Sequence, residues 1–176
     1  YDTQDIRTTL PITGLERLNL KFSTPGMPGY AFNEEEGVPF QVYKIEEVKV
    51  DESFNRGQFY KIYFISPEAY NNDTTRVSQA FEGVIEDAVD ILLRDKTFLN
   101  SKKELFFEPT KSNTKNVIPN LKPINTIKFL GKQARSSLYA NTGYMFYETA
   151  TGFNFRSIES MLAMGGASAR PSKWSF

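Results

Sequence analysis

The chain has 176 residues, of which 40% are hydrophobic and 24% charged, with a formal net charge of zero, so its composition is globular rather than disordered. Cysteine and histidine are both absent, which excludes disulfides, thiolate or histidine metal sites and Ser-His-Asp hydrolases within this chain. No apolar run approaches the roughly 20 residues that span a membrane, and we expect no membrane association. Aromatic residues make up 14% of the chain, which favours strands.

The first periodic segment is residues 17–22, where polar and apolar side chains alternate strictly. Leu18, Leu20 and Phe22 fall on one face, which predicts a half-buried strand. Two prolines and two glycines within residues 23–29 then predict a loop.

Two further strands follow. Residues 40–50 alternate, but the pattern slips near Glu46 and Glu47, which predicts a bulge there. Residues 51–57 are typical of a hairpin loop, and residues 58–65 return as a strand with bulky side chains on both faces. Such a strand is usually covered on both sides, as in a barrel or an oligomer. Residues 66–75 are polar and turn-rich, and we place a subdomain boundary there.

The next segment shows helical periodicity. Apolar residues recur at helical spacing over residues 80–95 and predict an amphipathic helix. Residues 105–107 predict a short strand, residues 113–116 a turn, and residues 117–118 a strand that stops at Pro119.

A second helix is predicted to begin near Pro123, because proline suits the first helical turn. The residues expected on its buried face are Ile124, Ile127, Leu130, Ala134 and Leu138. Residues 144–147 and 153–155 predict a hairpin around residues 151–152, and residues 165–176 have the composition of a linker.

Together these elements predict an α+β fold in which strands dominate. Residues 1–77 would form an incomplete antiparallel, barrel-like subdomain. Residues 78–160 would hold two amphipathic helices packed on short strands, and residues 161–176 would be a linker or tail.

Charge is unevenly distributed along the chain. Residues 1–95 hold 17 acidic and 9 basic residues, whereas residues 96–176 hold 4 acidic and 12 basic residues. This asymmetry would suit two attracting subdomains, complementary faces of a head-to-tail assembly, or contact of the basic half with nucleic acid. Scattered rather than clustered lysines argue against nucleic acid.

Paired carboxylates are the remaining route to catalysis, as in a glycosidase. The candidate groups are Glu34–Glu36, Glu46–Glu47 and Asp51–Glu52, all in loops or on an alternating strand. Such acids are usually solvated, as are Glu86, Asp87 and Asp90 on the polar helix face. We therefore assign no catalytic, cofactor-binding or metal-binding residue.

Some aromatic residues exceed what one small core can hold. Phe59, Tyr63, Tyr144 and Tyr147 either fill a barrel and its helix interface or form contacts between subunits, because aromatic residues concentrate in interface cores.

The order of motifs resembles the baseplate or tail hub proteins of contractile-tailed, T-even-like bacteriophages, and more remotely the spike proteins of type VI secretion. The segments that carry the resemblance are Leu10–Glu16, Leu18–Gly26, Phe59–Glu68, Val77–Phe81, Ile118–Pro123 and Phe146–Ser157. Together they cover roughly residues 8–160. Family members are longer, so we expect this chain to be a portion of a hub protein.

The resemblance implies a structural protein of the virion, made in the host cytoplasm, without catalytic residues or cofactors of its own. It implies barrel-like subdomains that assemble as a homotrimer whose paired subdomains imitate sixfold symmetry, and that join the tail tube to the central spike. The alternative from another class is a carboxylate-based glycan hydrolase or glycan-binding tail module, which requires two acids facing each other across a cleft.

Overall fold

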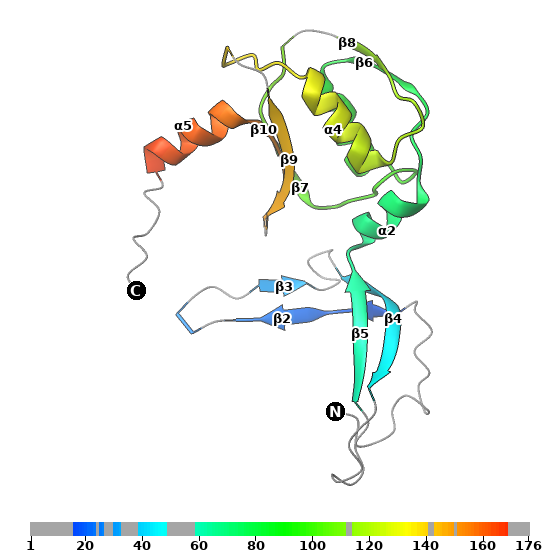
Figure 1. Ribbon diagram of the computed structural model, residues 1–176. Coiled ribbons are helices and arrows are strands. Elements are labelled where there is room, and N and C mark those ends of the chain that lie inside the picture. The colour runs from blue at the N-terminus through cyan, green and yellow to red at the C-terminus, as the bar shows by residue number, and fades with distance from the viewer. Residues whose placement is uncertain are drawn as a thin grey trace. The chain divides into compact units, whose positions relative to one another are not determined.

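The computed structural model describes residues 16–23, 25–26, 30–32, 39–48, 59–111, 114–140, 143–149 and 151–168 (Figure 1). The chain divides into two compact units, residues 1–70 (unit 1) and 71–176 (unit 2). The fold is mixed α+β and rich in strands, which confirms the predicted class. The described strands form small sheets and do not close into a barrel.

Unit 1 contains a three-stranded sheet and a separate hairpin. The sheet has the order β1 (Arg17–Leu18), β4 (Phe40–Val48), β5 (Phe59–Ile65), and both pairings are antiparallel. The hairpin joins β2 (Leu20–Phe22) to β3 (Tyr30–Phe32). The segment predicted as one strand is therefore divided at Asn19 between two sheets, although its extended conformation is confirmed.

The irregularity in β4 lies earlier than predicted. The register shifts between Val42 and Lys44, so the bulge is at Tyr43 and not near Glu46 and Glu47. The extra residue places Val42 opposite Phe64 and Ile45 opposite Ile62. Residues 62 and 64 share one face of β5, so the bulge places both Val42 and Ile45 on that face.

The segment predicted as a turn-rich boundary contains helix α2 (Pro67–Thr74), so the expected turns are wrong, whereas the two units do divide within it, between residues 70 and 71. Residues 66 and 67 have side chains that favour a helix start. Pro67 occupies the first helical position, and the Ser66 hydroxyl accepts a hydrogen bond from the Ala69 N–H at 3.2 Å. These two residues form an ordinary helix start that the polar composition concealed.

Unit 2 combines two small sheets with helices. The elements are β6 (Ala80–Gly83), α3 (Ile85–Arg94), β7 (Glu104–Phe107), β8 (Thr114–Val117), α4 (Pro123–Gln133), β9 (Tyr144–Thr149), β10 (Gly152–Ser157) and α5 (Ile158–Ser168). β10 lies between β7, to which it is parallel, and β9, to which it is antiparallel. β6 pairs with β8 in antiparallel orientation.

Two predicted boundaries in unit 2 were wrong. The helix expected over 80–95 begins only at Ile85, because residues 80–83 pair as a strand with residues 114–117. Gly83 has φ +125, which is incompatible with a right-handed helix and separates β6 from α3. The turn expected over residues 113–116 is accordingly mostly strand β8.

The C-terminal helix is a further difference. α5 begins directly after β10 and continues to Ser168, so it includes residues 161–168, which we expected in a linker. Its leucine, methionine and alanine residues are good helix formers, and they offset the two consecutive glycines.

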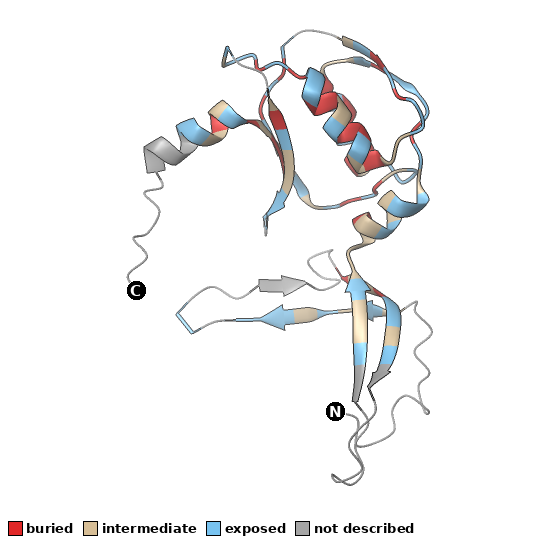
Figure 2. Cartoon of the chain, in the orientation of Figure 1, coloured by how far each residue is buried: buried red, intermediate tan, exposed pale blue. Residues whose placement is uncertain are grey.

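The core of unit 2 lies between helices α3 and α4 and the β7-β10-β9 sheet. Figure 2 shows buried residues along one side of α4, where Ile127, Leu130 and Ala134 of the predicted apolar face are fully buried. Leu138 lies beyond the end of α4 and is 69% exposed, so its predicted burial is wrong. Among the described residues, no helix is long and apolar enough to cross a membrane.

Candidate functional site

Two glutamates of unit 2 are buried, and they are the strongest candidates for chemistry among its described acids. Glu86 is 9% exposed and Glu108 is 4% exposed. The sequence analysis placed Glu86 on the polar face of its helix with Asp87 and Asp90. The two aspartates are indeed exposed, but the prediction was wrong for Glu86.

Glu86 binds Thr110 at the first turn of α3. The Thr110 N–H donates to both carboxylate oxygens, at 3.1 and 3.2 Å, and the Thr110 hydroxyl also donates to the carboxylate. The same hydroxyl accepts a hydrogen bond from the Ile85 N–H at 3.2 Å. This exchange works like a capping box, except that the capping residue comes from a distant loop. Thr110 therefore satisfies both the helix start and the buried carboxylate.

Glu108 binds the segments that follow α4 and precede α5. The Ser136 hydroxyl donates to one carboxylate oxygen, while the N–H and hydroxyl of Ser157 donate to the other at 2.8 and 2.6 Å. Burial would raise the pKa of Glu108, but hydrogen bonds from Ser136, Ser157 and Ser160 outweigh it and hold this pKa below the usual value. Glu108 is thus held as a carboxylate in the interior.

Tyr144 on β9 lies beside Glu108 in the same buried region. Its hydroxyl donates to the backbone carbonyl oxygens of Glu108 at 3.3 Å and Pro109 at 3.1 Å. Burial, and then the negative charges of Glu108 and Glu86, raise the pKa of Tyr144 well above its ordinary value. The phenol is therefore a neutral donor over the ordinary pH range and would be a poor general base.

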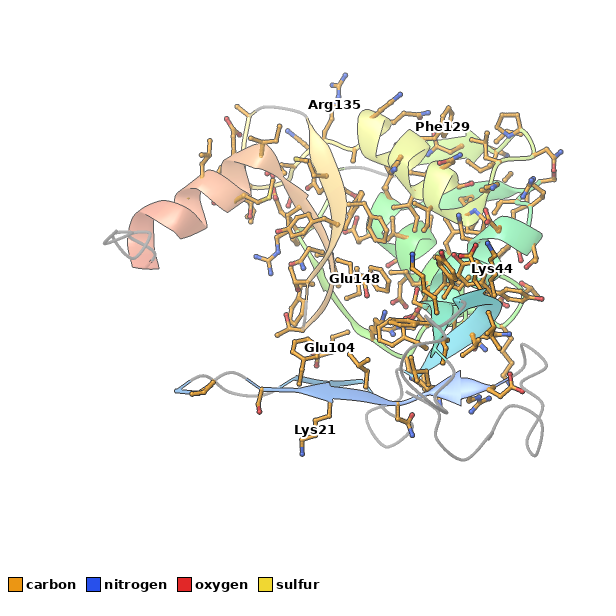
Figure 3. All side chains as sticks on the ribbon, turned by 60° about the horizontal axis from the view of Figure 1, so that its bottom comes forward. Lys21, Lys44, Glu104, Phe129, Arg135 and Glu148 are labelled. Carbon is orange, nitrogen blue, oxygen red and sulfur yellow. The ribbon has the colours of Figure 1, made fainter. Side chains whose placement is uncertain are left out.

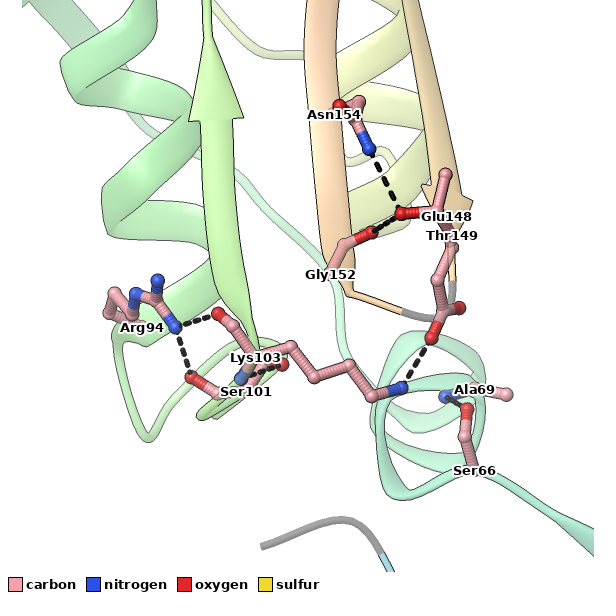
Figure 4. A network of polar contacts seen from close by, with 9 residues as sticks. All are labelled: Ser66, Ala69, Arg94, Ser101, Lys103, Glu148, Thr149, Gly152 and Asn154. Atoms are coloured by element: carbon pink, nitrogen blue, oxygen red, sulfur yellow. Dashed lines mark hydrogen bonds and ion pairs between the residues drawn. The ribbon is translucent and has the colours of Figure 1, made fainter. Parts of the chain in front are cut away.

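A second polar network lies at the other end of the β7-β10-β9 sheet (Figure 4). Lys103, just before β7, forms a 2.5 Å ion pair with Glu148 of β9 and lies 5.3 Å from the centre of the Phe153 ring. Arg94, at the end of α3, donates to the backbone carbonyl oxygens of Ser101 and Lys103. These cations join the three strands and the end of α3, and each has a structural role.

In unit 1, the face of the β4–β5 pair that carries Lys44 combines charge with aromatic rings (Figure 3). The Tyr63 hydroxyl donates to Glu46 at 2.7 Å, and the amines of Lys44 and Lys61 lie 5.1 and 5.0 Å from the centre of its ring. The bond from Tyr63, and then the charge of Lys44, lower the pKa of Glu46. Tyr43, 53% exposed, lies beside Tyr63 with ring centres 6.2 Å apart.

The four predicted interface aromatics are divided between the two units. Phe59 and Tyr63 are on β5, in unit 1, and the Phe59 side chain lies outside the described residues. Tyr63 is half-buried on the polar face of the strand pair, and Tyr147 is half-buried on β9. Tyr144 is in the core of unit 2, where its ring lies 4.8 Å from that of Phe155.

Of the predicted carboxylate pairs, only Glu46 has a described side chain, and it is exposed and bound to Tyr63. The side chains of Glu34–Glu36, Glu47 and Asp51–Glu52 lie outside the described residues. The part of the chain that the structure describes contains no group of three or more acidic residues placed to hold a metal ion.

Sequence reasoning missed Glu108 and its partners altogether. One local signal was present, because Ser157 directly precedes α5 and accepts the Ser160 N–H at 3.1 Å, as an N-cap residue does. Nothing local marks Glu108, which lies 49 positions before Ser157.

Comparison with known proteins places no constraint on this arrangement: no family model matches the chain, and no similar curated protein or solved structure was found.

Proposed function

We propose that the chain is a structural subunit of a phage baseplate hub that acts through protein–protein contacts and links the tail tube to the central spike. Two of the motifs that resemble the hub family lie on or directly before described elements of unit 2. Residues 146–157 span most of the β9–β10 hairpin, and residues 118–123 lead into α4. In this proposal the sheet of unit 1 corresponds to part of a hub barrel that neighbouring chains complete.

The observation that carries the proposal is the exposure of the β4–β5 pair. Among the described residues of unit 1, only Pro39, Val42 and Glu68 are buried. Aromatic side chains are exposed on both faces, with Tyr43 53% exposed on one and Phe64 38% exposed on the other. Aromatic residues are enriched where protein surfaces meet, and strands with two aromatic faces are usually covered on both.

The contacts of the buried acids also support a structural role. Glu86 and Glu108 accept hydrogen bonds from threonine, serine and backbone N–H groups. Each of these bonds lies at the start of α3, at the start of α5 or in the segment that follows α4. Their burial is therefore explained by packing, without a substrate. A hydrolase would instead need two acids separated by an open cleft.

Light scattering after size exclusion tests the proposal on the full chain. We expect a species of three times the 20.1 kDa chain mass at high concentration, or stable binding to purified tail tube or spike protein. The double variant Tyr43→Ser with Phe64→Ser should weaken this association at least about tenfold, because hot-spot aromatics each contribute 2 kcal/mol or more.

Tyr70→Ser is the matched control, because Tyr70 is an exposed aromatic of the same unit on α2 rather than on the sheet. It should leave association unchanged, and circular dichroism should show all variants folded. A strict monomer at every concentration, without binding to tube or spike protein, would contradict the proposal.

A further inference from the structure

We propose that Glu108 is a carboxylate latch that holds helix α5 on unit 2, and that neutralising this one side chain releases α5 while the rest of unit 2 stays folded. The inference concerns unit 2 alone and does not depend on the proposed function.

Among the side chains of helix α5 that the structure describes, residues 158–163, burial is concentrated in the first turn. Ser160 is the buried residue among the described side chains of α5, whereas Ile158 is 49% and Leu162 is 70% exposed. Figure 1 shows the helix continuing from the end of β10. Over residues 158–163, whose side chains the structure describes, apolar packing therefore contributes little, and the polar contacts at the start of the helix supply much of the attachment of this part.

Those polar contacts converge on Glu108. Ser157 donates both its N–H and its hydroxyl to one carboxylate oxygen, and the same hydroxyl accepts the N–H of Ser160 in the first turn of α5. The Ile158 N–H adds one bond to the Gly143 carbonyl oxygen at 3.2 Å. A donor polarised by a carboxylate is a better acceptor in turn, so the cap depends on the charge of Glu108.

The charge also acts on the helix as a whole. A carboxylate at a helix N-terminus interacts favourably with the helix dipole, and a neutral acid does not. The other oxygen of Glu108 accepts the Ser136 hydroxyl, so the carboxylate connects the end of α4 to the start of α5. Protonation would remove the charge and one acceptor position at this junction, and both losses weaken the hold on α5.

The direction of the pH dependence follows from the surroundings of the carboxylate. Tyr144 on β9 is the titratable group that faces it, Glu86 on α3 acts on the same Tyr144, and Glu159 adds an acid in the first turn of α5. Because the pKa of Glu108 is held below its usual value of 4.5, the latch is closed above that pH. It opens as the pH falls through the lowered pKa of the folded protein.

Pulsed EPR with two spin labels tests the latch in the full chain. The natural chain has no cysteine, so Leu162→Cys on α5 and Lys132→Cys on α4 give two unique labelling positions, both exposed. At pH 7 the parent pair should show one narrow distance distribution. Glu108→Gln should broaden it and raise the detached population about tenfold or more, as expected for losing hydrogen bonds to a charged group.

Glu104→Gln is the matched control, an exposed glutamate on the neighbouring strand β7, and it should keep the narrow distribution. Ser157→Ala, which removes only the hydroxyl, should release α5 partially. It replaces Glu108→Gln as the test variant if Glu108→Gln does not fold. Hydrogen exchange of α4 amides reports whether unit 2 stays intact. The latch is refuted if Glu108→Gln keeps the parent distribution, or if α4 loses protection together with α5 in both variants.

Discussion

The side-chain oxygen of Asn72 on α2 accepts a hydrogen bond from the backbone N–H of Ile124 at 2.9 Å. Ile124 is in the first turn of α4, whose own N-cap residue, Lys122, provides no side-chain cap. Asn72 therefore performs the function of an N-cap residue from 52 positions away. Next to it, Asp73 forms a 2.5 Å ion pair with Lys122, so α2 holds the start of α4 at two points.

The same principle recurs at the other helices of unit 2. Thr110 satisfies the Ile85 N–H at the start of α3, and Glu108 orients Ser157 at the start of α5. The first N–H groups of any helix need partners outside the helix, and here long-range contacts supply them. The helix starts are therefore the points where distant parts of unit 2 are joined.

Replacing Asn72 with alanine should lower the free energy of unfolding by about 1 kcal/mol, the usual cost of losing an N-cap side chain. Urea unfolding of the full chain measures the change. Asn125→Ala is the matched control, because Asn125 is an exposed asparagine on α4, and it should change stability by less than about 0.5 kcal/mol. Equal losses in both variants would show that the bond between Asn72 and Ile124 contributes nothing.

Gly152→Ala should disrupt the start of the central strand β10 of the β7-β10-β9 sheet. Gly152 has φ +146, and a Cβ there would overlap the backbone carbonyl oxygen of Glu104 in the parallel strand. We expect a loss above about 3 kcal/mol, more than backbone strain alone. Gly83→Ala separates backbone strain from the steric overlap, because Gly83 also has a positive φ, +125, but has open space around it. The stability lost in Gly83→Ala should therefore not exceed the cost of backbone strain alone. Thermal unfolding compares the two.

A double-mutant cycle on Glu86 and Thr110 should show strong coupling between them. Thr110→Val alone removes the hydroxyl that donates to Glu86 and accepts from the Ile85 N–H, while the backbone N–H bonds to the carboxylate remain, and it should cost about 1–3 kcal/mol. Adding Glu86→Leu should recover part of that loss, because no buried charge that has lost a donor remains. We expect a coupling energy of about 1–3 kcal/mol from chemical unfolding. Additive effects would mean that the short contacts between these residues contribute no net stability.

Stability at high pH should depend on Tyr144. Its pKa is raised in the folded protein above the usual value of 10.0, so the unfolded chain loses the phenolic proton first. Stability linked to Tyr144 is therefore fully present below about pH 10 and declines as the pH rises further. Tyr144→Phe should flatten this decline in thermal unfolding between pH 9 and 11, whereas Tyr147→Phe on the same strand should not. Identical slopes in Tyr144→Phe and the parent would contradict the assignment.

The local sequence pattern was sufficient to predict those helices and strands whose apolar residues follow one pattern without interruption. The run of bulky residues over 58–65, the helical spacing after Pro123 and the aromatic hairpin around Gly152 all predicted elements that form. Prediction was wrong where a pattern was ambiguous: polar composition concealed α2, and the apolar residue Phe81, read as the start of a helix, belongs to strand β6.

The sequence by itself determined the α+β class, the main strands and helices, and the absence of cysteine and histidine chemistry, because each depends on composition or on neighbours along the chain. Only the tertiary structure decided that Glu86 and Glu108 are buried, and that Asn72, Thr110 and Glu108 complete helix starts elsewhere. Those contacts join residues 24 to 52 positions apart, so their energies depend on distances that exist only after the elements have packed.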